Sequence, residues 1–121
     1  AAVDRVYYPG LASHPQHHLA MSQQGGLGGA VLSFAVKANN PDDARKRAFH
    51  VLDSMQVVSL ATNLGDTKSM GTHPASTSHG RMTEAQRQSA GIGQGLIRVA
   101  VGLEHIEDIK TDFARGLDTL T

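Results

Sequence analysis

The sequence contains no cysteine and no tryptophan, and only 4% of its residues are aromatic. The absence of cysteine excludes disulfides, thiolate nucleophiles and cysteine zinc sites, and it is typical of proteins from a reducing compartment. A formal net charge of zero, with few aromatic rings, gives no basic surface on which bases could stack, so no nucleic-acid partner is expected. No apolar run approaches the ~20 residues of a membrane-spanning helix, so no membrane association is expected.

What remains is an ordinary globular composition, in which 40% of the 121 residues are hydrophobic and 18% are charged. This length suits one domain that buries about two thirds of its unfolded surface. The chain begins Ala-Ala-Val-Asp, with neither an initiator methionine nor a signal-peptide pattern. We therefore expect residues 1–121 to form a single domain cut from a longer protein.

Apolar periodicity and capping signals predict strands and helices that alternate along the chain. The expected helices are 13–24, 41–55, 83–90 and 105–120, and the expected strands are 30–36, 57–60 and 96–101. The segment 61–80 is interpreted as an irregular loop, which is too long to serve only as a connection between two elements. This order predicts an α/β fold, a two-layer sandwich in which a small, open, mostly antiparallel or mixed sheet carries helices on one face.

The stretch from Gly95 to Glu104 predicts a buried strand that contains one permanent cation. If the segment is extended, its side chains alternate between two faces: Ile97, Val99 and Val101 on one, Leu96, Arg98 and Ala100 on the other. A guanidinium in an apolar strand is costly unless it is paired or binds an anion. The spacing leaves two interpretations open, a sheet-edge or ion-paired arginine and a clamp for a carboxylate.

Other candidate sites have less support from the sequence. No carboxylate completes a metal site beside the histidines, so no metal is predicted; the histidines considered are His14, His17, His18, His73 and His79. The Gly25–Gly29 run leads into a strand, which favours a flexible link over a phosphate loop. Lys68 lies in a polar setting and is interpreted as a surface lysine. No catalytic residue is assigned.

Four stretches resemble, in this order, the C-terminal domain of the Cys/Met-metabolism family of pyridoxal-phosphate (PLP) enzymes: Tyr8–His17, Asn63–Asp66, His73–Gly80 and Gly95–Glu104. That family has fold type I and includes cystathionine γ-synthase, the cystathionine and methionine γ-lyases and the homoserine-ester sulfhydrylases. Within it, the runs 61–66 and 78–80 resemble the O-succinylhomoserine sulfhydrylase branch most closely.

The resemblance implies roles for particular residues. Arg98 would hold the α-carboxylate of the amino-acid substrate in a fork that lysine cannot supply. Asn63 and Leu64 would line the same pocket and offer main-chain polar groups to that carboxylate. Thr77 and His79 would support the loop. With the family in view, the carboxylate clamp becomes the favoured interpretation of Arg98.

The resemblance also implies that residues 1–121 are a substrate-binding C-terminal domain. The PLP-binding domain, with its Schiff-base lysine and phosphate-binding residues, would lie outside this chain, which alone would hold no PLP and be inactive. The full-length enzyme is expected to be a cytoplasmic homo-oligomer, like the family's tetramers, in methionine synthesis. It would replace the succinate of an O-acyl-homoserine by sulfide to give homocysteine, with the cofactor carrying the electron chemistry.

Two alternatives stay open. A cystathionine γ-synthase, a γ-lyase or an O-acetylhomoserine sulfhydrylase would share this domain and differ in nucleophile, leaving group or reaction direction. The run Lys68-Ser-Met-Gly71 departs from the hydroxyl-rich sequence usual in the sulfhydrylase branch, which bears on the leaving group. An autonomous domain that binds a small carboxylate would show the same alternation of strands and helices.

Overall fold

The computed structural model describes residues 1–120 and contains one five-stranded mixed sheet, in the strand order β1-β2-β5-β4-β3. Every adjacent pair is antiparallel except β3 and β4, which are parallel. The strands are β1 (Val3–Tyr7), β2 (Val31–Val36), β3 (Ser59–Leu60), β4 (Met70–Thr72) and β5 (Leu96–Ala100). The helices are α1 (His17–Gln23), α2 (Pro41–Asp53), α3 (Glu84–Ser89) and α4 (Ile106–Leu117), with a short 3₁₀ helix η1 (Pro74–Ser76). None of the helices in this part of the chain is long and apolar enough to cross a membrane.

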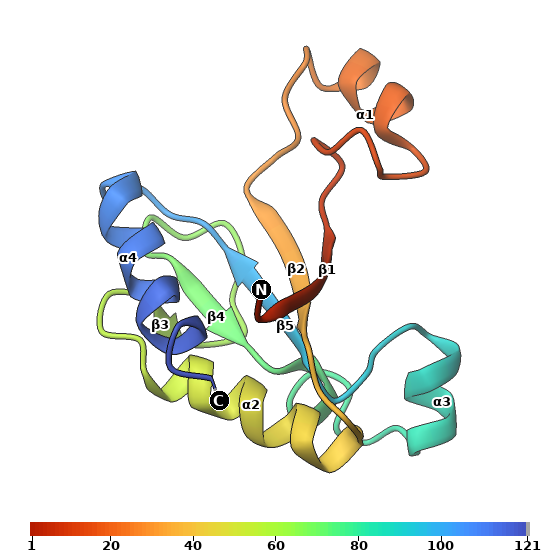
Figure 1. Cartoon of the computed structure of the whole chain (residues 1–121). Helices are drawn as coiled ribbons and strands as arrows, with labels where there is room; N and C mark the ends of the chain where they lie inside the picture. Colours follow the sequence, from red (N-terminus) through yellow and green to blue (C-terminus); the bar gives the residue numbers. More distant parts are fainter. Residues whose placement is uncertain (121) are drawn as a thin grey trace.

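Helices α2 and α4 pack side by side and enclose the hydrophobic core against one face of the sheet (Figure 1). The α2 helix begins as predicted, because the Asn40 side chain accepts a hydrogen bond from the Asp43 N–H at 2.9 Å and Pro41 takes the first helical position. The core side chains come from α2, β2 and β5: Phe34, Val36, Ala48, Val51, Leu52, Ile97 and Val99. The predicted α/β architecture is confirmed.

The β5 strand lies in the middle of the sheet and separates its side chains as predicted. Ile97 and Val99 are buried against the helices, at 0% and 1% exposure. Arg98 therefore points to the opposite face, where its cross-strand partners are Ser33 on β2 and Thr72 on β4. Because β5 pairs on both sides, the interpretation of Arg98 as a sheet-edge residue is wrong.

The first helix begins later than predicted. The Ser13 side chain caps nothing, and α1 starts at His17 after a series of turns in which successive N–H groups donate to Tyr8, Leu11 and His14 carbonyls. Pro15 disfavours a helical backbone at the residue before it, which explains why the helix cannot extend to Ser13. The Thr83–Gln86 capping box at the start of α3 is present as predicted.

The predicted strand 57–60 is wrong in its first half, and the expected strands include neither β1 nor β4. The N–H groups of 56–58 donate to the Asp112 carboxylate on α4, so only Ser59 and Leu60 pair as β3. The short β4 strand lies within the segment interpreted as a loop. Its middle residue, Gly71, gives no strand signal, and a Cβ there would come 3.1 Å from Leu52 Cδ2.

Residues 8–30 carry α1 away from the sheet as a projecting arm (Figure 1). The base of the arm is closed by Tyr8 Oη, which donates to the Gly29 carbonyl at 2.9 Å. Gly28 packs so closely there that a Cβ would come 2.8 Å from the Gly10 nitrogen. The Gly25–Gly29 run leads into the β2 strand, as predicted. A phosphate loop would lead into a helix instead.

Candidate functional site

Arg98 lies on the sheet face that α2 and α4 leave uncovered. Its guanidinium makes one hydrogen bond within the described chain, from Nη2 to the Thr62 carbonyl at 2.6 Å. None of the ion pairs among residues 1–120 involves Arg98. The ion-paired interpretation is therefore wrong for this part of the protein. A guanidinium carries five N–H donors, so most of them remain available for an anion.

The Thr62 carbonyl belongs to the 61–69 loop, which follows β3 and leads into β4. Asn63 and Leu64 come directly after Thr62, and both are exposed, Leu64 at 55%. The loop's first residue is fixed because Ala61 N–H donates to the Gly71 carbonyl at 3.1 Å. The structure thus brings Thr62, the residue before the predicted Asn63–Leu64 segment, next to the Arg98 guanidinium, although 36 residues separate Thr62 from Arg98.

Thr77 is connected to the Arg98 strand through one neighbour. Its hydroxyl donates to the His73 carbonyl at 2.8 Å and lies 3.1 Å from the hydroxyl of Thr72, the residue that pairs with Arg98 across β4 and β5. Because the Thr77 hydroxyl donates its proton to the His73 carbonyl, the Thr72 hydroxyl is the donor in its hydrogen bond with the Thr77 oxygen. These bonds join the segment after β4 to the strand beside Arg98.

His79 makes its contacts to the protein mainly through the backbone. Its N–H donates to the Pro74 carbonyl at 2.9 Å, and its carbonyl accepts from Arg87 Nη1 at 3.3 Å. The ring nitrogen Nδ1 lies 2.9 Å from the neighbouring Ser78 hydroxyl. His79 is therefore part of the turn after η1, and nothing in residues 1–120 connects its ring directly to Arg98.

His73, interpreted from the sequence as a loop-fixing residue, is 2% exposed and makes two side-chain hydrogen bonds. Its Nε2 lies 2.7 Å from the Gln94 carbonyl, so that nitrogen carries the proton, and Nδ1 accepts from the Ser76 hydroxyl at 2.8 Å. Burial lowers the pKa of His73; the Gln94 carbonyl raises it, and the charges of Arg45 and Arg87 lower it further. Neutral His73 ties η1 to the segment that enters β5.

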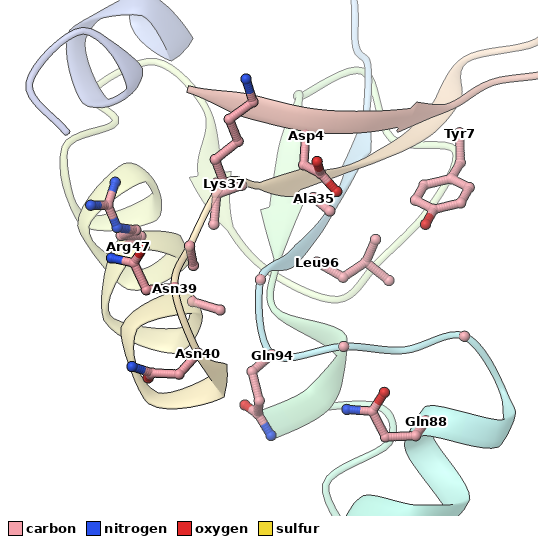
Figure 2. Close-up of a pocket in the computed structure, with 16 residues that line it drawn as sticks. Asp4, Tyr7, Ala35, Lys37, Asn39, Asn40, Arg47, Gln88, Gln94 and Leu96 are labelled. Carbon is pink, nitrogen blue, oxygen red and sulfur yellow. The ribbon is translucent and has the colours of Figure 1, made fainter. Parts of the chain in front are cut away.

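A cleft of about 770 Å³ opens near Arg98 but does not include it. Leu96 and Ala35, which pair across β5 and β2, line the cleft, and they lie two residues along from the Arg98–Ser33 pair. Its polar lining mixes amide with charged and aromatic side chains: Asn39, Asn40, Gln88, Gln94, Asp4, Lys37, Arg47 and Tyr7 (Figure 2). This cleft is thus adjacent to the Arg98 position and separate from it.

The other candidate residues do not gather into a site. Among residues 1–120, no three His, Asp or Glu side chains come together in a way that could hold a metal ion. The Lys68 ammonium donates to the Val57 carbonyl and lies 3.6 Å from Glu104 Oε1. Its side chain is 47% exposed, which agrees with the prediction of a surface lysine.

Comparison with known proteins identifies the family of the chain. Residues 1–118 match the family model described as Cys/Met metabolism PLP-dependent enzyme. The chain is 55% identical over 118 residues to the O-succinylhomoserine sulfhydrylase of Pseudomonas aeruginosa, and it is 42% identical to an L-methionine gamma-lyase of Fusobacterium nucleatum subsp. polymorphum. In both comparisons 98% of this chain aligns with 28% of the relative.

A solved structure gives the same result for the fold. Cystathionine gamma synthase from Xanthomonas oryzae pv. oryzae, crystallised in complex with aminoacrylate and cysteine, superposes with a TM-score of 0.85 at 40% identity. The match covers 98% of this chain and 29% of that one, so the chain spans less than a third of the length of these relatives. On these matches, the chain belongs to the Cys/Met metabolism family of PLP-dependent enzymes.

Proposed function

We propose that residues 1–121 are the C-terminal, substrate-binding domain of a PLP-dependent O-succinylhomoserine sulfhydrylase, and that Arg98 holds the substrate α-carboxylate. The observation that supports this most directly is the environment of Arg98. The guanidinium is half-buried on an interior strand, it has no carboxylate partner among residues 1–120, and its one hydrogen bond goes to the Thr62 carbonyl. A cation held in that way favours a ligand with two anionic oxygens.

The hydrogen bond to Thr62 determines which N–H groups of Arg98 remain for the substrate carboxylate. A planar guanidinium that uses one Nη2 proton on a carbonyl still presents paired N–H groups to a carboxylate, which the single ammonium of lysine cannot do. The main chain at Asn63 and Leu64, directly after Thr62, is the next set of polar groups along the loop. We propose that this backbone completes the carboxylate site and that Thr77 and His79 keep the neighbouring turn in place.

The lysines of this chain do not fit the family's cofactor. A lysine that holds PLP needs a free amine inside a pocket, whereas Lys68 is engaged by the Val57 carbonyl and by Glu104. Lys37 is exposed although it lines the cleft, and Lys46 and Lys110 are exposed as well. PLP acts as an electron sink when it is bound. We therefore assign the cofactor, and the catalysis that depends on it, to the part of the enzyme outside this chain, and we expect this chain alone to be inactive.

The comparisons support the sulfhydrylase branch over its neighbours. The sulfhydrylases of Pseudomonas aeruginosa and Mycobacterium tuberculosis are 55% and 47% identical to this chain, and the L-methionine gamma-lyase of Fusobacterium is 42% identical. The second candidate function is a γ-lyase, a cystathionine γ-synthase or an O-acetylhomoserine sulfhydrylase built on the same domain. We propose that the full-length enzyme is a cytoplasmic homo-oligomer that acts on O-succinylhomoserine and sulfide.

The test is Arg98→Lys in the full-length enzyme with PLP bound. Loss of the bidentate contact is expected to raise the KM for O-succinylhomoserine about 30-fold, equivalent to about 2 kcal/mol, with a smaller change in kcat. Arg81→Lys, an exposed arginine outside the site, is the matched control. An unchanged KM in Arg98→Lys would mean that Arg98 has only a structural role. Comparison of O-succinylhomoserine, O-acetylhomoserine, cystathionine and methionine as substrates separates the branches.

A further inference from the structure

The segment that follows β5 is bonded to the far end of the 61–69 loop. Glu104 Oε1 accepts from the Ser69 N–H at 2.8 Å, and Oε2 accepts from the Ser69 hydroxyl at 2.7 Å. The same hydroxyl accepts from the Gly102 N–H at 2.7 Å, and the Leu103 N–H donates to the Thr67 carbonyl at 2.7 Å. We call this set of bonds the Ser69–Glu104 link.

The link is closely packed. Ser69 is completely buried although it is polar, and both of its donors end on the Glu104 carboxylate. Gly102 has no room for a side chain, because a Cβ would lie 2.5 Å from the Ser69 nitrogen and would overlap the Thr67 carbonyl oxygen. The Lys68 ammonium, 3.6 Å from Glu104 Oε1, adds a partly exposed ion pair. Two strand ends are thus held together by a buried hydroxyl and a charge-assisted pair of hydrogen bonds.

Two attachments of the loop lie on β5 and on the segment directly after it. Arg98 holds the loop at Thr62, near its start, and the Ser69–Glu104 link holds its end. Between these points, Asn63 and Leu64 are exposed. Asp66 Oδ1 accepts two hydrogen bonds within the loop, from the Lys68 N–H at 2.9 Å and from the Thr67 hydroxyl at 3.4 Å. The position of the exposed part is therefore set by its two ends.

We propose that Glu104 is a positioning residue for substrate binding: through Ser69 it fixes the loop so that the Asn63–Leu64 backbone stays beside the Arg98 guanidinium. A substrate carboxylate that takes up Arg98 donors competes with the Thr62 carbonyl for the same group. When that happens, the Ser69–Glu104 link still orders the loop together with the Ala61–Gly71 and Lys68–Val57 bonds, and it lowers the entropic cost of substrate binding. This inference rests on the proposed function of Arg98.

The test compares Glu104→Gln with Glu107→Gln in the full-length enzyme with PLP bound. The control makes the same chemical change on an exposed residue whose side chain, within residues 1–120, bonds only to Lys110. Glu104→Gln is expected to raise the KM for O-succinylhomoserine about tenfold and to change kcat less than about threefold. It is also expected to speed amide hydrogen exchange about tenfold at Leu103, whose N–H donates to the Thr67 carbonyl of the loop. The control is expected to change none of these.

Ser69→Ala is the second variant, because Glu104→Gln removes a charge and could impair folding. It keeps the Ser69 N–H bond to Glu104 and loses both hydroxyl bonds, so smaller changes in the same direction are expected. Unchanged exchange at Leu103, or an unchanged KM, in both variants would overturn the inference. If Arg98→Lys raises the KM and these variants do not, only the positioning role fails; if Arg98→Lys has no effect, the proposed function itself fails.

Discussion

Gly116 of α4 lies directly against the backbone of Val51 of α2. A Cβ on Gly116 would come 2.8 Å from the Val51 Cα and 3.0 Å from its carbonyl oxygen. Val51 is completely buried, so it cannot move away without displacing its helix. The two helices that cover β5 therefore approach each other at a point where only glycine fits, and this contact sets how the helical layer packs on the Arg98 strand.

Gly116→Ala is accordingly expected to destabilise the domain by about 1 to 3 kcal/mol, the usual cost of overpacking a core. The gain in helix propensity from glycine to alanine, about 1 kcal/mol, opposes this cost and does not remove it. Urea denaturation of the 121-residue chain measures the free energy of unfolding. Gly93→Ala is the matched control, because a Cβ there meets nothing within 4 Å. Equal stability of both variants would show that α2 and α4 can separate at no cost.

Asp112→Asn is expected to lower the free energy of unfolding by about 2 to 3 kcal/mol. The buried carboxylate accepts hydrogen bonds from three successive N–H groups of residues 56–58 at 2.7 to 3.0 Å. An asparagine would turn an NH₂ group towards at least one of these donors and leave a buried donor unsatisfied. Burial raises the pKa of Asp112, but the backbone hydrogen bonds and Arg115 more than offset this and lower it overall. Asp108→Asn, at the exposed start of α4, is the control in the same denaturation experiment.

The parts of the fold that could be predicted from the sequence are those controlled by near neighbours. The Asn40-Pro41 helix start, the Thr83–Gln86 capping box and the alternation around Arg98 depend on residues within a few positions of each other. The length of β3 does not depend on near neighbours. It is set by Asp112, more than 50 residues away, whose carboxylate accepts hydrogen bonds from the N–H groups before β3. No local sequence pattern indicates this contact.

The candidate site also combines features that the sequence predicts with contacts that it does not predict. Strand periodicity predicted which face Arg98 occupies, and the family resemblance pointed to Asn63 and Leu64. The bond from Arg98 to Thr62 and the link between Ser69 and Glu104 each join segments about 35 residues apart. These contacts depend on the strand order of the sheet, which places β5 beside β4. No single stretch of the sequence determines that order.

His73 is expected to make the domain less stable as the pH falls below about 6.5. Burial lowers the pKa of this histidine in the folded chain, whereas the unfolded chain titrates near the ordinary value of 6.5. Between the two values the unfolded state binds a proton that the folded state does not, so stability falls by up to about 1.4 kcal/mol per pH unit. Unfolding free energies at about pH 7.5 and 5.5, for the native chain and His73→Gln, measure this effect. An equal pH dependence in both would show that His73 becomes protonated in the folded state as readily as in the unfolded state.

Glu104 is expected to stabilise the domain above about pH 4.5 and to lose that contribution in acid. The Ser69 hydroxyl and N–H lower the pKa of Glu104 from 4.5 to about 2, so the folded state favours the carboxylate that accepts both bonds. As the pH falls towards 2, protonation removes this preference, and the carboxylate becomes similar to the neutral amide of Glu104→Gln. The Tm of the native chain should therefore exceed that of Glu104→Gln at about pH 6, and the two should converge at about pH 2. Glu84, which Gln94, Arg87 and Gln88 hold at a pKa of about 2, contributes equally to both proteins and cancels in the comparison. A difference in Tm that stays constant with pH would mean that the charge of Glu104 plays no part in the link.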